Sequence, residues 1–151
     1  MTGANGPEAL RKRTQEMFVR NLQLLSDGRI DEWLDLFHPD GVLEFPFPPA
    51  GWQASLRGRA ALAEHMKHFP EQLRMTFSEV TFHETTDPEL IVAEFTSEGT
   101  ALVTGRTFRQ TYVSVVWTEN GLITRFRDFW NPLVITEALG GADAAEQAVA
   151  N

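Results

Sequence analysis

The feature that most constrains the fold of this chain is a change in the spacing of its apolar residues at Pro70. Before Pro70, apolar residues recur mostly every three or four positions, as in an amphipathic helix. After Pro70 they alternate with polar residues, as in a strand with one buried face. Helices followed by a long run of strands indicate an α+β domain.

Turn and capping residues set the boundaries of the expected helices. Pro7 suits the first turn of a helix, and Asp27-Gly28 ends it. Two more helices are expected over 30–37 and 59–69, with a short strand and a proline-rich loop over 41–51 between them.

Four strands are expected after Pro70, over 73–84, 89–103, 107–118 and 122–131. The apolar phase shifts between Phe77 and Val80, which predicts a bulge. Asn120-Gly121 is typical of a tight hairpin turn. An antiparallel sheet of this kind, strongly curved over the N-terminal helices, would enclose a cone-shaped pocket.

The 151 residues are interpreted as one domain, 1–151, because no linker divides them. Residues 1–6 and about 141–151 are expected to be loosely ordered, the latter because this tail is rich in alanine. Eleven Phe and four Trp but only one Tyr favour an aromatic-lined cavity, although packing alone could use these rings.

Charge and cysteine content exclude several classes of function. A net charge of −8 disfavours nucleic acid and anionic membranes as partners. The absence of cysteine removes disulfides and thiolate chemistry, and fits a cytoplasmic protein. No apolar run approaches the roughly 20 residues of a membrane-spanning helix, and the N-terminus lacks an apolar signal core.

Asp128 is the first candidate for chemistry. Alternation along the last strand puts Leu122, Thr124, Phe126, Asp128 and Trp130 on one face, and the neighbouring arginines on the other. A carboxyl between two rings should have a raised pKa and be able to hold or take a proton. The alternative is a structural aspartate that accepts a hydrogen bond from a tryptophan or a backbone N–H.

His65 is the second candidate. It shares an apolar helical stripe with Leu62, Met66 and Phe69, so it should face inward. A histidine and a carboxyl across one pocket form a usual acid–base pair, whereas a lone core histidine is more often structural. His65 and His68 lie poorly on one face and lack a third ligand, so no metal site is predicted.

Other residues are expected to contact a ligand. Asn21, near the apolar face of the first helix, would orient a carbonyl or satisfy a neighbouring group. Trp52 would cover the pocket mouth or anchor a surface loop, and Glu44 would point into the pocket or away from it. The predicted substrate-binding set is Asn21, Glu44, Phe45, Trp52, Phe69, Tyr112, Phe126 and Trp130.

Four segments carry a resemblance to a known family: RGRAALAEHMKHFP, FHETTDPELIVAEFTSEG, ENGLITRFRDFWNP and EALGG. With them the chain resembles the nuclear-transport-factor-2-like (SnoaL-like) superfamily, and within it the phenazine-biosynthesis A/B proteins. The resemblance implies a cone-shaped, cystatin-like α+β barrel and a homodimer formed through the sheet. It also implies cofactor-free condensation of amino ketones, with acid–base residues at positions that match His65 and Asp128.

The chain departs from the family at several positions. Asp128 stands where the family has glutamate, and a pocket arginine falls around Trp33 or Leu34. The oxyanion tyrosine and the catalytic base of the related ketosteroid isomerases fall on Asn21 and Phe45, which excludes that mechanism. The substrate is therefore expected to differ from the phenazine precursor and to be more apolar.

The sequence thus predicts a cofactor-independent enzyme of specialised metabolism. It would promote cyclisation, condensation, isomerisation or dehydration of a small apolar carbonyl compound. The alternative is a non-catalytic carrier or sensor of an apolar metabolite.

Overall fold

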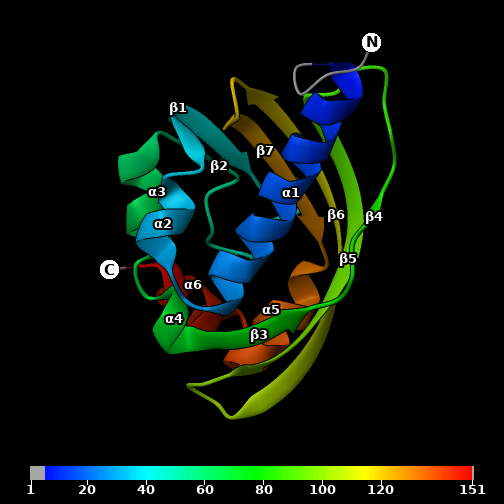
Figure 1. Cartoon of the computed structure of the whole chain (residues 1–151). Coiled ribbons are helices and arrows are strands. Elements are labelled where there is room, and N and C mark those ends of the chain that lie inside the picture. The colour runs from blue at the N-terminus through cyan, green and yellow to red at the C-terminus, as the bar shows by residue number, and fades with distance from the viewer. Residues whose placement is uncertain (1–5, 151) are drawn as a thin grey trace.

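The computed structural model describes residues 6–150, in which helices pack on the concave side of one curved sheet (Figure 1). The helices are α1 (Pro7–Ser26), α2 (Ile30–Leu34), α3 (Arg59–Met66), α4 (Phe69–Gln72), α5 (Pro132–Leu139) and α6 (Ala142–Val149). The strands are β1 (Phe37–Glu44), β2 (Ser55–Arg57), β3 (Leu73–Phe77), β4 (Thr81–Phe82), β5 (Leu90–Ala101), β6 (Arg106–Glu119) and β7 (Leu122–Trp130).

The sheet has the strand order β2-β1-β7-β6-β5-β3, and β4 also pairs with β5. The strands after Pro70 pair antiparallel with one another, as predicted. β1 differs, because it pairs parallel with β7. The α+β class and the curved sheet are confirmed, but the sheet is mixed and its two edge strands, β2 and β3, leave it unclosed.

Helix α1 lies across the concave face of the sheet (Figure 1). Phe18 is fully buried, and its ring contacts those of Phe82, Phe95 and Phe126, with centroids 5.6–6.1 Å apart. Aromatic contacts of this geometry add to the burial of apolar area. They join the first helix of the chain to strands that follow it by more than sixty residues.

Two bulges change which residues face the core. Phe77 of β3 pairs with Ser97 of β5, and Thr81 of β4 pairs with Glu94 of β5. The segment from Phe77 to Thr81 is one residue longer than the segment of β5 that it faces, which confirms the predicted bulge. At a second bulge, Thr124 of β7 has no register partner in β6, although its hydroxyl donates to the Trp117 carbonyl.

The second bulge corrects the alternation expected for the last strand. Ile123, rather than Leu122, is fully buried, since the extra residue at Thr124 reverses the faces on its N-terminal side. Beyond the bulge, Phe126, Asp128 and Trp130 share the inner face, as predicted.

Two helix boundaries also differ from the sequence-based expectation. The second helix ends at Leu34 rather than Phe37, because Phe37 already begins β1. Pro70 does not separate helix from strand; it occupies the first turn of the short helix α4, where its missing N–H is not needed.

The C-terminal tail is ordered in the structure, contrary to the expectation for residues from about 141. Asn131 caps α5 by accepting a hydrogen bond from the Leu133 N–H, and Gly140 ends this helix at φ 107°. Helix α6 follows, and its Ala145 is fully buried. Of the N-terminal residues expected to be loose, 1–5 lie outside the described residues, as does 151; Gly6 is the N-cap of α1.

Tertiary contacts explain why the tail is ordered. The Trp52 Nε1–H donates to the Ala145 carbonyl at 2.8 Å, and the Gln72 amide donates to the Ala148 carbonyl at 2.6 Å. Both donors lie far from α6 in the sequence, so composition alone could not indicate them. Within residues 6–150, no helix is long and apolar enough to cross a membrane.

Candidate active site

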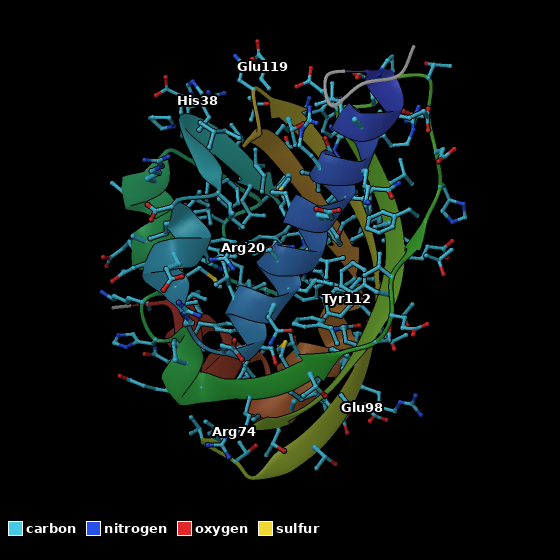
Figure 2. All side chains as sticks on the ribbon, viewed as in Figure 1. Arg20, His38, Arg74, Glu98, Tyr112 and Glu119 are labelled. Carbon is cyan, nitrogen blue, oxygen red and sulfur yellow. The ribbon has the colours of Figure 1, made fainter. Side chains whose placement is uncertain are left out.

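A cavity of about 130 Å³ lies between α1, α3 and the inner face of the sheet, and α5 and α6 add to its wall. The inner face of β6 supplies Tyr112, which points toward the interior in Figure 2, whereas Glu98 lies on the outside. Most of the lining is apolar, and the polar residues of the wall are Asn21, His65, Gln72, Gln110, Tyr112 and Asp128.

Asp128 enters the cavity from β7, directly opposite Ser114 of β6. Its two carboxyl oxygens accept hydrogen bonds from the Ser114 hydroxyl and the Trp130 indole N–H, each at 3.1 Å. Burial raises the pKa of the carboxyl from 3.8 to about 7, although both hydrogen bonds act in the opposite direction. The effect of desolvation on the pKa of Asp128 is therefore larger than the combined effect of the two hydrogen bonds.

The arginines beside Asp128 in sequence do not reach it. Arg125 and Arg127 lie on the outer face of the sheet, where both contact Glu44 and stack over Trp117. Among residues 6–150, no cation pairs with this acid, as alternation predicts. Its hydrogen bond from Trp130 also matches the structural alternative, so a proton-transfer role for Asp128 is still a hypothesis.

His65 enters the cavity from α3, on the same side as the buried Leu62 and Met66. Its ring packs against Phe45 and Trp52, with centroids 5.4 and 5.1 Å apart. Burial lowers the pKa of the imidazole from 6.5 to about 4. His65 is therefore neutral at neutral pH.

His65 and Asp128 share the cavity but do not bond to each other. Among the described residues, no hydrogen bond or ion pair joins them. Aromatic rings form an indirect connection: Trp52 contacts both His65 and Trp130, and the Trp130 N–H binds Asp128. A ligand would have to bridge the two groups if they act on it together.

Seven of the eight residues predicted to bind substrate line this cavity: Asn21, Phe45, Trp52, Phe69, Tyr112, Phe126 and Trp130. Glu44, whose orientation the sequence left open, does not belong to the predicted substrate-binding set. Leu43 of β1 and Phe45 directly after it are buried on the inner side, so Glu44 points outward. There the hydrogen bond from Arg125 and that from Arg127 lower the pKa of Glu44 despite its partial burial.

Several lining residues escaped the sequence-based prediction. Gln110 and Phe108 share the face of Tyr112 in β6, and alternation could have found both, together with Ser114. Ile135, Leu139, Ala148 and Val149 come from α5 and α6, which were not predicted. No group of three or more His, Asp or Glu side chains in the described part of the chain could hold a metal ion.

Residues 15–126 match the sequence pattern of the SnoaL-like domain family. The chain belongs to this family. A curated relative, an uncharacterised PhzA/B-like protein of Pseudomonas aeruginosa, is 48% identical over 135 residues, covering 89% of this chain and 96% of the relative.

Solved structures agree with the SnoaL-like assignment. One, from Bacillus subtilis and described provisionally as an isomerase, has 34% sequence identity and a TM-score of 0.82, covering 86% of this chain and 94% of its own. Another, a phenazine biosynthesis-related protein from Pseudomonas aeruginosa, has 22% identity and a TM-score of 0.73, covering 92% of both chains. The second likeness supports the fold alone.

Proposed function

We propose that this SnoaL-like protein is a cofactor-independent enzyme that moves protons on a small, largely apolar, carbonyl-containing molecule. The observation that carries the proposal is the Asp128 carboxyl, which lies in the wall of an apolar cavity with a pKa of about 7. A general acid or base works best when its pKa is close to the working pH.

Asp128 would act in its ionised form as the base. The carboxylate would take a proton from the carbon next to the carbonyl group, and the C–H electron pair would form the C=C bond of an enol or enolate. The protonated acid would then return the proton to a different position. The rings around Asp128 would keep water from competing for it.

His65 would assist as a neutral hydrogen-bonding group. No hydrogen bond from the described residues engages its ring nitrogens, so both are available to a ligand. Since burial keeps the pKa of His65 near 4, it would stay neutral while it donates a hydrogen bond to a carbonyl or accepts one from a hydroxyl.

Removal of a proton next to a carbonyl is a step that cyclisation, condensation, isomerisation and dehydration can share. The PhzA/B-like relative and the Bacillus subtilis structure described provisionally as an isomerase support chemistry of this kind. A role in specialised metabolism, on a substrate more apolar than a phenazine precursor, fits the predominantly apolar wall.

One observation favours a second function, the non-catalytic binding of an apolar metabolite. His65 and Asp128 form no direct bond among the described residues, so they are not arranged as a preformed pair. A binding module would need the apolar wall and no proton transfer.

Proton exchange separates the two functions without knowledge of the natural substrate. The probe is 2-indanone, a compact apolar ketone, dissolved in D₂O, with loss of its α-proton NMR signal as the measurement. The wild-type protein should accelerate exchange, and Asp128→Asn should lower that acceleration by roughly 10²- to 10⁴-fold. Affinity for the ketone should change much less, because the rings supply most of the contact.

Glu44→Gln provides the matched control. It also removes a carboxylate from the sheet, but from the outer face, so exchange should proceed at the wild-type rate. If wild-type protein binds 2-indanone without accelerating exchange at any pH between about 5 and 9, proton transfer is refuted and the binding function is favoured.

A further inference from the structure

Asn21 is a fully buried amide in the wall of the cavity. It lies within α1, one residue before the buried Leu22, and its side chain joins α1 to α2. Buried amides normally satisfy both their oxygen and their nitrogen with hydrogen bonds. Asn21 satisfies only one of the two.

The orientation of this amide follows from its partner. The Trp33 indole N–H lies 2.7 Å from Asn21 Oδ1. An indole nitrogen can only donate, so the oxygen of Asn21 must face Trp33 and the NH₂ group must face elsewhere. Among residues 6–150, Asn21 Nδ2 has no hydrogen-bond partner.

A donor held in this way selects for an acceptor on the ligand. Leaving a buried N–H unpaired is unfavourable, so a ligand oxygen that accepts from it gains affinity. The same site discriminates against a ligand of equal shape that lacks the oxygen.

The surrounding charges narrow the class of acceptor. No Lys or Arg of the described chain lines the cavity, and Asp128 is the acid within it. A ligand carboxylate or phosphate would therefore enter without a cation to balance it, which is costly in an apolar site. A neutral carbonyl oxygen meets the need of the amide without that cost.

We propose that Asn21 is the carbonyl-binding residue of this cavity, and that its ligand is a neutral ketone or enone whose oxygen accepts from Nδ2. An engineered apolar cavity of about 150 Å³ holds a benzene ring, so a cavity of about 130 Å³ suits a compact molecule built on a single aromatic ring. The part of Asn21 in a reaction rests on the proposed function, whereas its part in binding a carbonyl does not.

The amide would also contribute to the reaction. When the Asp128 carboxylate takes a proton from the carbon next to the carbonyl, the C–H pair becomes part of the C=C bond and the carbonyl π pair moves onto oxygen. The hydrogen bond from Asn21 then meets a developing negative charge and becomes stronger. Asn21 would thus stabilise the enolate more than the bound ketone.

A matched pair of ligands and a matched pair of variants test the inference. The ligands are 2-indanone and 2-methyleneindane, in which a C=CH₂ group replaces the C=O group at the same position. The variants are Trp33→Phe, which retains Asn21, and the double variant Asn21→Leu with Trp33→Phe. Removing both partners together avoids an unpaired indole N–H, which Asn21→Leu alone would leave.

The measured quantity is the ratio of ketone to alkene affinity, from calorimetric or NMR titration. It should be about tenfold lower in the double variant than in the wild-type protein, the loss expected for one hydrogen bond, and Trp33→Phe should lie between the two, because its amide remains but is no longer fixed by the indole. Alkene affinity should change by no more than about twofold, showing that the cavity is intact. An unchanged ratio in the double variant would overturn the assignment of Asn21.

The outcomes distinguish this inference from the proposed function. If the ratio of ketone to alkene affinity depends on Asn21 but the protein does not accelerate α-proton exchange, the carbonyl site is supported and the proposed enzymatic function is refuted. Accelerated exchange with a ratio independent of Asn21 would refute the carbonyl site alone.

Discussion

Replacing Asp128 with asparagine should reveal its raised pKa as a pH-dependent change in stability. Burial raises the folded-state pKa of the carboxyl to about 7, while the unfolded chain titrates near the ordinary value. Below the unfolded pKa, both states are protonated. As pH rises from there to about 7, only the unfolded chain loses the proton, so the wild-type protein becomes less stable.

The magnitude follows from the two pKa values. Between them, each pH unit changes the free energy of unfolding by about 1.4 kcal/mol. From pH 5 to pH 8 the wild-type protein should therefore lose about 2.5 kcal/mol at this site, with most of the loss complete by pH 7. Other titrating groups also make the free energy of unfolding depend on pH. The same groups are present in Asp128→Asn, so their effects cancel when the two proteins are compared.

Asparagine is a good mimic of the protonated acid here. Its oxygen can accept from the Trp130 indole, and its NH₂ group can donate to Ser114 once that hydroxyl turns. The variant should consequently match the wild-type protein in stability only below the unfolded pKa, and at pH 5 it should already be the more stable by about 1.5 kcal/mol. By pH 8 the difference should have grown by about 2.5 kcal/mol to about 4 kcal/mol, because the variant never buries a charge.

Urea unfolding followed by tryptophan fluorescence, at pH 5, 6, 7 and 8, measures both proteins under the same conditions. The quantity of interest is the difference between their free energies of unfolding. A difference that stays constant from pH 5 to pH 8 would show that the folded-state carboxyl ionises below pH 5. The basis for assigning it an acid–base role would then be lost.

Two further predictions concern neighbours of the site. Ser114→Ala removes a hydrogen bond that lowers the pKa of Asp128, so the pH at which proton exchange of 2-indanone reaches half its maximum should move upward; no movement would show that Ser114 does not influence the acid. Trp52→Phe removes the donor to Ala145, so amide hydrogen exchange in α6 should become faster and unfolding easier by about 1 kcal/mol. Trp117→Phe, on the outer face, makes the same change of side chain and should leave α6 unaffected; equal effects of the two variants would contradict the role given to Trp52.

Residues with a strong local signal were predicted well from the sequence. Alternation is a property of the strand backbone itself, so Phe126, Asp128 and Trp130 could be placed on the inner face without knowledge of their partners. The helical spacing of apolar residues likewise placed His65 on the inner side of its helix. Glu44 was not resolved, because its strand is short and one position decides the face.

Features that depend on partners distant in the sequence could not be predicted. The bulge at Thr124 arises from pairing between β6 and β7, and because of it Ile123 is buried in place of Leu122, which alternation had assigned to the inner face. The order of the alanine-rich tail depends on hydrogen bonds from Trp52 and Gln72.

Residue spacing and turn chemistry were enough to predict the α+β class, the helices that precede Pro70 and the antiparallel strands that follow it. The chemistry of the cavity depends on the tertiary structure. It placed Ser114 opposite Asp128, left that acid without a cation, and fixed Trp33 as the donor to Asn21. A pKa depends on the groups around a side chain in space, and so does the free hydrogen-bonding capacity of an amide; those groups are brought together only by folding.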